Sequence, residues 1–154
     1  MSEGQHDIQC PVSPYLVCAQ SASAIDFYKA AFGAEQMVRL NHADGSVMHA
    51  TLKIKGGIIM VSEENKEWGM LGPKALGGTP VTIHLEVPDA DAVFAQAVEA
   101  GAEVAMPMDD AFWGARFGMV MDPFGHKWSI ATTTKHMTEE EMQAAAANIS
   151  PECG

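Results

Sequence analysis

Apolar and polar residues alternate along several short segments of the chain, a pattern typical of β-strands with one buried face. In residues 81–87 the polar positions between the apolar ones are Thr82, His84 and Glu86. Residues 47–55 alternate in the same way, with Met48, Ala50, Leu52 and Ile54 expected on one face and Val47, His49, Thr51, Lys53 and Lys55 on the other. Further strands are predicted near residues 36–42, 58–61, 103–107, 118–121 and 127–132, with a loop between residues 107 and 118.

Two other segments carry apolar residues at the spacing of one helix face. The first ends at Phe32, and either Ser21 or Ser23 is expected to cap its free N–H groups. Gly33 suits the left-handed position beyond its last turn. The second helix is expected to begin at Asp89 and to end at Gly101.

Residues 15–35 and 84–103 share one order: a strand, a short polar turn, an amphipathic helix and the triplet Gly-Ala-Glu. In this internal repeat Tyr15 corresponds to His84. The repeat predicts an α+β fold of two β-α-β-β-β modules whose mixed sheets curve into a cup. The cup would be open to ligands, because the strand faces opposite the helices are polar.

We expect one domain over residues 1–154, because the chain is of ordinary domain length. It would comprise module 1 (about residues 10–62), a glycine-rich linker (63–78), module 2 (79–134) and a helical tail (135–154). In the tail, Thr138 and Glu141 form the pattern of a capping box.

The composition is 47% hydrophobic and 19% charged, which is typical of a globular protein, and the net charge is −11. That charge disfavours binding to nucleic acid or to an anionic membrane. The polar, acidic start of the sequence does not resemble a signal peptide. The three cysteines, Cys10, Cys18 and Cys153, show no metal-ligand spacing, so we expect reduced thiols and a cytoplasmic protein.

Several motifs occur in an order that resembles the PhnB-like branch of the vicinal oxygen chelate superfamily, which includes glyoxalase I, bleomycin-resistance proteins and extradiol dioxygenases. They are Pro14-Tyr15-Leu16, Ala24-Ile25-Asp26-Phe27-Tyr28-Lys29, Ala31-Phe32-Gly33-Ala34, Phe112-Trp113-Gly114 with Arg116, and Asp122-Pro123-Phe124-Gly125-His126 with Trp128-Ser129-Ile130-Ala131-Thr132. The resemblance implies the same paired-module fold and a homodimer, with or without exchange of modules between chains. Open sheet edges, which proteins hide by pairing, favour the same dimer.

Catalytic members of that superfamily hold one divalent metal with four His, Gln or Glu side chains. The resemblance places those four positions at Ser13, Thr51, Thr82 and Ser129. Neutral hydroxyls are poor ligands for such ions. We therefore expect no metal cofactor, and the metal-dependent activities of the superfamily are not carried over.

His49 and His84 are the candidate catalytic residues, and we expect them to face a common cavity because each lies two positions from a threonine of the polar face. Three interpretations remain open for them: hydrogen-bonded polar groups of a half-buried sheet, substrate contact or acid–base chemistry, and a new metal site completed by Glu86. Arg116 either clamps an anionic ligand beside Trp113 or pairs with Asp109 or Asp110. The predicted ligand-binding residues are Ser13, Tyr15, His49, Thr51, Thr82, His84, Glu86, Trp113, Arg116 and Ser129.

These features favour a metal-free protein that binds a small molecule in its cup. One alternative is a lyase, isomerase or transferase that uses His49 or His84 as an acid or base. The other is a fold retained only as an interaction module. The sequence does not specify the ligand.

Overall fold

The computed structural model describes residues 10–149, in which two modules share one topology. Module 1 consists of β1 (Tyr15–Cys18), α1 (Ser21–Phe32), β2 (Glu35–Asn41), β3 (Val47–Ile54) and β4 (Gly57–Glu63). Module 2 consists of β5 (Thr82–Glu86), α3 (Ala90–Ala100), β6 (Glu103–Ala111), β7 (Ala115–Met121) and β8 (Lys127–Thr133). The connecting segment contains η1 (Lys66–Trp68) and α2 (Pro73–Leu76), and α4 (Glu139–Ala146) follows module 2.

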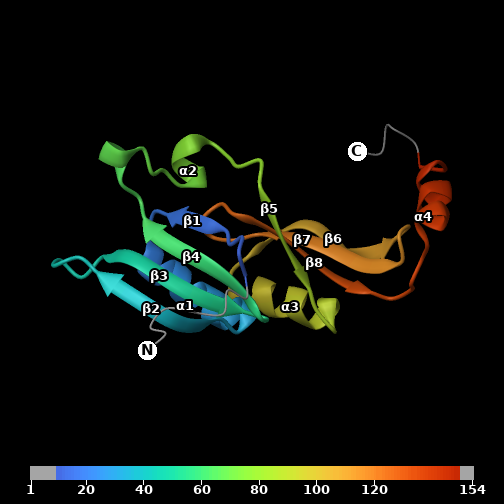
Figure 1. The fold of residues 1–154 in the computed structure, drawn as a ribbon, viewed down its shortest axis with the longest axis horizontal. Coiled ribbons are helices and arrows are strands. Elements are labelled where there is room, and N and C mark those ends of the chain that lie inside the picture. The colour runs from blue at the N-terminus through green and yellow to red at the C-terminus, as the bar shows by residue number, and fades with distance from the viewer. Residues whose placement is uncertain (1–9, 150–154) are drawn as a thin grey trace, which may run out of the picture.

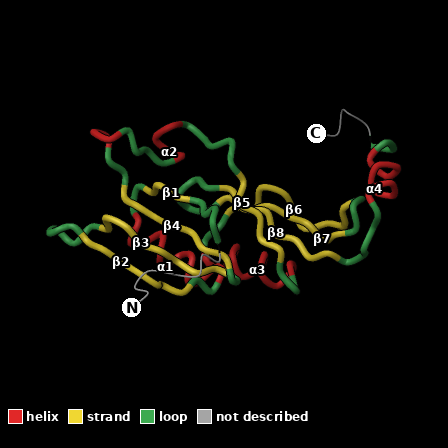
Figure 2. The backbone as a smooth tube through the Cα atoms, in the orientation of Figure 1, coloured by secondary structure: helices red, strands yellow, loops and turns green. Residues whose placement is uncertain are grey.

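The strands of each module form a mixed four-stranded sheet, in the orders β1-β4-β3-β2 and β5-β8-β7-β6. β1 runs parallel to β4 and β5 parallel to β8, while the other neighbours are antiparallel. The two sheets lie side by side, with α1 and α3 next to each other beneath them (Figures 1 and 2). The α+β class and the paired β-α-β-β-β modules are thereby confirmed. No helix in the described part of the chain is long and apolar enough to cross a bilayer.

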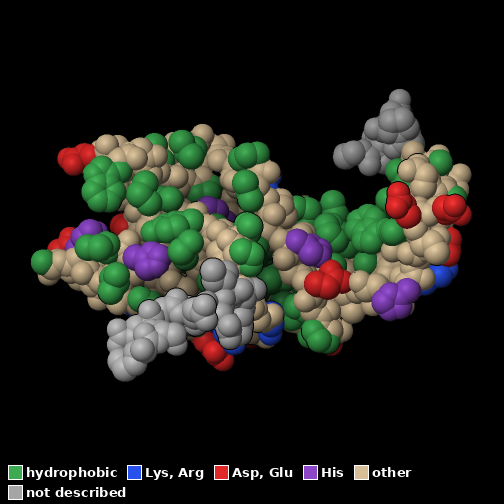
Figure 3. Space-filling view, viewed as in Figure 1, with side chains coloured by type: hydrophobic (Ala, Val, Ile, Leu, Met, Phe, Trp, Pro, Cys, Tyr) green, Lys and Arg blue, Asp and Glu red, His purple; other side chains and the backbone are tan. Residues whose placement is uncertain are grey.

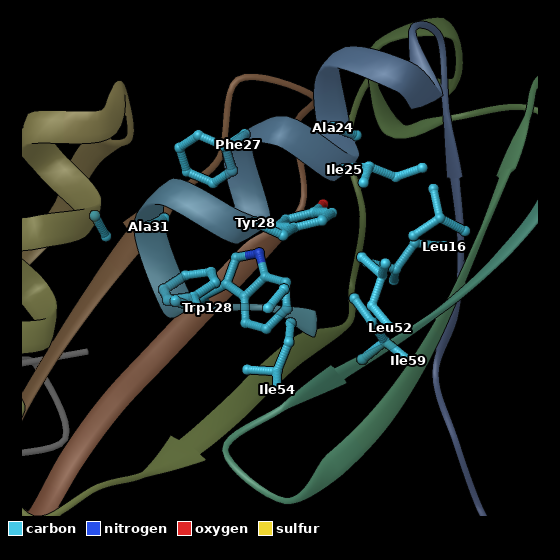
Figure 4. Close-up of a cluster of buried hydrophobic side chains, with 14 of the residues drawn as sticks. Leu16, Ala24, Ile25, Phe27, Tyr28, Ala31, Leu52, Ile54, Ile59 and Trp128 are labelled. Carbon is cyan, nitrogen blue, oxygen red and sulfur yellow. The ribbon is translucent and has the colours of Figure 1, made fainter. Parts of the chain in front are cut away.

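The hydrophobic core joins the two modules through α1 (Figure 4). Trp128 of β8 is fully buried, and its ring centroid lies 4.6 Å from that of Phe32 and 5.4 Å from that of Tyr28. Both of these partners belong to α1, so a side chain of module 2 completes the core of module 1. Burial of large aromatic side chains of this kind is among the strongest stabilising contributions in a small domain.

A buried carboxylate reinforces the same junction. Asp122 is 3% exposed and accepts hydrogen bonds from the Tyr28 hydroxyl at 2.6 Å and from Trp128 Nε1 at 3.0 Å. It also accepts the backbone N–H groups of Phe124 and His126 at 2.9 and 3.0 Å. Burial, followed by the charge of Asp122, raises the pKa of Tyr28 well above its usual value, so the hydroxyl remains a donor.

Most of the expected helix ends are confirmed, but the cap of α1 is not. Asp89 accepts the N–H of Ala92 at 3.1 Å, and Gly33 has a φ of +68°. Neither Ser21 nor Ser23 caps α1, because the helix already begins at Ser21, whose hydroxyl donates to the Cys18 carbonyl at 3.3 Å. The N–H of Ser21 donates instead to Glu63 Oε2 at 3.0 Å. The carboxylate of Glu63, at the end of β4, therefore serves the start of the helix.

Two strand predictions are also corrected. The loop expected between residues 107 and 118 is the end of a long hairpin, because β6 continues to Ala111 and β7 begins at Ala115. In β3 the expected alternation fails at its first two residues, where a register shift leaves Val47 buried and Met48 46% exposed.

The buried thiol of Cys18 should be chemically inert in the folded protein. Burial, with a smaller contribution from Asp122, raises its pKa from 9.0 to about 12. Since the thiolate is the reactive form, Cys18 should react roughly a thousandfold more slowly than an ordinary thiol. Peptide mapping after brief iodoacetamide treatment should find Cys10 labelled and Cys18 unlabelled. Comparable labelling of both residues without denaturant would contradict this assignment.

Candidate functional site

His49 and His84 both lie on the sheet face opposite the helices. In β3, the neighbours of His49 on the helix side include Ala50 and Leu52, which are fully buried. In β5, Leu85 is buried on the helix side while His84 is exposed. The strand alternation therefore placed both imidazoles on the correct face of their sheets. We call these faces the open face of module 1 and the open face of module 2.

The open face of module 1 carries a hydrogen-bonded chain of three predicted residues. The Tyr15 hydroxyl lies 3.0 Å from His49 Nδ1, and His49 Nε2 lies 3.0 Å from Thr51 Oγ1. A cavity of about 370 Å³ adjoins this chain, and the segment that follows β4 forms one of its walls. Its lining residues are Tyr15, His42, Ser46, Met48, His49, Ser62, Glu63, Glu64, Asn65, Trp68 and Met70.

Ser62 is a functional candidate of this cavity that the sequence analysis did not identify. It is 3% exposed, and its hydroxyl has no hydrogen-bond partner among the described residues. A buried polar group without a partner is costly, so such a group at the wall of a cavity indicates a place where a ligand or water donates or accepts. The sequence did contain a signal for it, because alternation along β4 places Ser62 on the same face as Ile58 and Met60.

The open face of module 2 carries a second chain, centred on His84. Nδ1 of His84 lies 2.7 Å from Ser129 Oγ, and Nε2 lies 2.8 Å from Glu86 Oε2. Hydrogen bonds from Thr133, at 2.7 Å, and from His84 lower the pKa of Glu86, so this carboxylate is ionised and accepts. A neutral His84 therefore carries its proton on Nε2 and accepts the Ser129 hydroxyl proton at Nδ1.

Aromatic side chains extend this second chain across the sheet. The ring of Phe117 lies nearly parallel to the imidazole of His84, at a centroid distance of 6.3 Å, and meets Trp113 edge-on at 5.3 Å. Trp113 and Phe112 belong to the turn between β6 and β7. A cavity of about 650 Å³ follows this wall, lined by Met106, Pro107, Met108, Asp109, Asp110, Ala111, Phe112, Trp113, Phe117 and Ile149.

Arg116 does not share the open face with Trp113. Its guanidinium donates to both carboxylate oxygens of Asp91 on α3, at 2.8 and 3.2 Å, and more weakly to Asp110 at 3.4 Å. Since Phe117 points to the open face, its neighbour Arg116 points to the helix side. Pairing with Asp110 was one of the two interpretations, whereas the main partner, Asp91, was not foreseen.

The remaining predicted residues lie at the edges of these two groups of hydrogen-bonded side chains. Thr82 is the exposed first residue of β5, and Ser13 precedes β1, where its hydroxyl donates to the Cys10 carbonyl at 3.5 Å. The strand register also indicates that Met60, rather than Thr51, is the residue of module 1 that corresponds to Ser129 of module 2. Ser129 lies opposite His84, and the residue opposite Tyr15 is Met60 rather than Thr51, which lies one strand further.

The two histidines belong to separate hydrogen-bonded chains within one copy of the protein. The cavity beside His49 is lined by residues of module 1 and of the connecting segment, and His84 is not part of its lining. This cavity is therefore not the common cavity that the sequence predicted for His49 and His84.

The sequence model of the Glyoxalase/Bleomycin resistance protein/Dioxygenase superfamily matches residues 12–130. The chain belongs to this superfamily. An uncharacterized protein of Mycobacterium bovis is 42% identical over 145 residues, which cover 92% of this chain and 95% of that one. A gene product of Arabidopsis thaliana superposes with a TM-score of 0.65 at 31% identity, covering 80% of this chain and 98% of that one. TioX from Micromonospora sp. ML1 superposes with a TM-score of 0.65 at 29% identity, covering 79% and 97%.

The residues of this chain do not fit the divalent metal that catalytic members of the superfamily hold. Serine and threonine hydroxyls, and the thioether of Met60, replace the imidazoles and carboxylates that such an ion needs. Within residues 10–149 no three His, Cys, Asp or Glu side chains come together as a potential ion site. His49, His84 and Glu86 form no such group either, so the alternative metal site built from them has no geometric support.

A further cavity, of about 360 Å³, lies between β1, β5 and the connecting segment. Its walls are mainly apolar, and its histidine, His126, donates a hydrogen bond from Nε2 to the Val17 carbonyl oxygen at 2.9 Å. This contact ties the β7–β8 turn of module 2 to β1 of module 1. The cavity offers volume for an apolar group but no polar chain comparable to those of the open faces.

Proposed function

We propose that this chain is a PhnB-like member of the superfamily that binds a small organic molecule on its open faces without a metal ion. The observation that carries the proposal is the replacement of the metal ligands by hydroxyl and thioether groups beside intact hydrogen-bonded chains at His49 and His84. Ligand sites combine apolar walls with a few placed polar groups, and both open-face cavities have that character. The unpartnered hydroxyl of Ser62 supports the same conclusion.

A homodimer is part of this proposal. The edge strand β2 exposes Met37, Val38 and Leu40 by 56%, 45% and 52%. Exposed apolar residues on an unpaired edge favour contact with another chain. A second copy placed over the open faces would enclose cavities that a single copy leaves open. Sedimentation equilibrium at micromolar concentration should give about twice the 16.4 kDa of one chain; a mass of one chain would exclude the dimer.

The hydroxyl and thioether groups at the family's metal-ligand positions lead to a prediction about metal content. Protein purified without added metal should contain far less than one equivalent of zinc, nickel, manganese or iron. Elemental analysis after dialysis is the measurement. Stoichiometric metal that is lost on Thr82→Ala or Ser129→Ala, and retained in Thr134→Ala as a control, would contradict the proposal.

A second candidate function rests on the geometry of His84. Glu86 accepts a hydrogen bond from Nε2 of His84, and the Ser129 hydroxyl donates to Nδ1. Hydrogen bonds of this kind orient the imidazole of a general acid or base. A lyase, isomerase or transferase reaction that moves a proton at this imidazole would use that arrangement. Conversion of a bound molecule that His84→Gln stops, while binding persists, would favour this second candidate.

The binding proposal is tested by analysing the small molecules that purify with the protein in the presence of a chelator. Heat release followed by mass spectrometry should identify an organic compound retained by the native chain. Its amount should fall at least about fivefold in His49→Ala or Phe117→Leu, in keeping with the loss of one placed contact. Asp26→Ala, on the exposed side of α1, is the control and should retain it. Equal retention by all four proteins, or no compound at all, would overturn the proposal.

A further inference from the structure

One row of residues that crosses the strands on the open face of module 2 combines an aromatic ring with two carboxylates. Register places Glu86 opposite Ala131, Ala131 opposite Phe117 and Phe117 opposite Asp109. The four residues thus cross the sheet from β5 to β6. Ala131 is only 2% exposed, so its larger neighbours cover it, and Asp109 supplies a second carboxylate at the other end of the row, beside the 650 Å³ cavity that Phe117 also lines.

Aromatic rings surround this row at the same end of the sheet. Trp113 packs edge-on against Phe117, and Phe112 packs edge-on against Trp113 at a centroid distance of 4.9 Å. Phe112 and Trp113 remain 39% and 37% exposed, so ring surface is available to a ligand. In the space-filling view, hydrophobic side chains gather where this sheet approaches α4, with histidine and carboxylate side chains beside them (Figure 3).

The two carboxylates of this row differ in their partners: Glu86 is paired with the imidazole of His84 at 2.8 Å, whereas no ion pair is formed by Asp109 among the described residues. The described lining of the 650 Å³ cavity contains Asp109 and Asp110 but neither Lys nor Arg. Arg116, on the adjacent position of β7, is held on the helix side by Asp91 and contacts Asp110 there. Asp109 is therefore the carboxylate beside the aromatic rings that has no basic partner among the described residues, and Glu86, held by His84 and Thr133, adds negative charge at the other end of the row.

We infer that the open face of module 2 selects a flat aromatic organic cation, bound against Phe117 and Trp113 between the carboxylates of Glu86 and Asp109. This deepens the proposed function and rests on it, because it names the class of small molecule that the site takes. Aromatic faces attract cations through the ring quadrupole, and nearby carboxylates add charge complementarity. The same charges disfavour carboxylate or phosphate ligands.

The test uses two xanthene dyes of similar shape and opposite charge, the cation rhodamine 6G and the anion fluorescein. Fluorescence anisotropy at moderate salt should show rhodamine 6G binding at least about tenfold more tightly than fluorescein. Glu86→Gln and Asp109→Asn should each weaken rhodamine 6G binding by about three- to tenfold. Phe117→Leu, which keeps apolar volume but removes the ring, should weaken it by a similar factor. Thermal unfolding of each variant checks that it is folded.

Glu99→Gln on the exposed side of α3 makes the same charge change away from the site and should leave binding within about twofold. An equal loss in Glu99→Gln would mean that only net charge attracts the dye, and would overturn the inference. Equal binding of both dyes, reduced in Phe117→Leu, would overturn the choice of a cation while leaving the proposed function intact. Failure of both dyes would also overturn the inference, whereas the proposed function is decided separately by the molecules that purify with the protein.

Discussion

Replacing Asp122 by alanine should destabilise the protein by on the order of 4 kcal/mol, a large part of the stability of an ordinary domain. The change removes the acceptor of four donors and leaves the Tyr28 hydroxyl and Trp128 Nε1 buried without a partner. Each buried donor left unpaired costs about 1–3 kcal/mol. Because Tyr28 belongs to module 1 and Trp128 to module 2, the loss should affect both modules in one transition.

Urea unfolding followed by tryptophan fluorescence and by circular dichroism is the measurement. Asp26→Ala removes an equally charged side chain from the exposed side of α1 and should change the free energy of unfolding by less than about 0.5 kcal/mol. Similar midpoints for the two variants would mean that Asp122 does not hold the modules together. Separate transitions for the fluorescence of the core and for the secondary structure would contradict a shared core.

The second large effect is expected at Gly114, where alanine should cost about 3 kcal/mol. Gly114 has a φ of +83°, and a Cβ there would lie 2.5 Å from the Lys135 carbonyl oxygen. The carbonyl of Gly114 also accepts the N–H groups of Thr134 and Lys135 at 2.8 and 3.0 Å. A side chain at this position would therefore displace the segment after β8 and disturb the turn that presents Trp113.

Gly45→Ala is the matched control, because Gly45 has a φ of +89° but open space around its Cβ position. It should cost only about 1 kcal/mol, the effect of the left-handed backbone alone. The difference in the free energy of unfolding between the two variants measures the clash with Lys135. Equal losses would show that the contact between Gly114 and residues 134–135 adds nothing. Rhodamine 6G binding should fall in Gly114→Ala and persist in Gly45→Ala.

Local sequence signals were sufficient for most of the fold. Alternation in residues 81–87 and the Asp89 cap gave β5 and the start of α3, because these depend on neighbours within one turn or one strand. The cap of α1 depends on Glu63, which is distant in sequence, so no local pattern pointed to it. The β6–β7 hairpin was underestimated because proline, aspartate and glycine are poor strand formers, whereas cross-strand pairing with β8 holds β7 in place.

The site was predicted in its parts but not in its arrangement. Alternation placed His49 with Thr51 and His84 with Glu86, and the structure adds that each group forms its own hydrogen-bonded chain. Phe117 was missed because it fell in the expected loop. The direction of Arg116 follows from its place next to Phe117, so it became predictable only once β7 was known to begin at Ala115. Side chains brought together from different strands require the register, which the sequence does not supply.

A crystal structure of the protein purified from cells without added metal would test the central proposal most directly. The account predicts density for an organic molecule on an open face, in contact with Tyr15 and His49 or with His84 and Phe117, and no anomalous signal from a transition metal there. A metal peak coordinated by residues of the open faces would contradict it. Density for the molecule confined to the apolar cavity between β1 and β5 would contradict it equally, because the hydrogen-bonded chains would then have no part in binding.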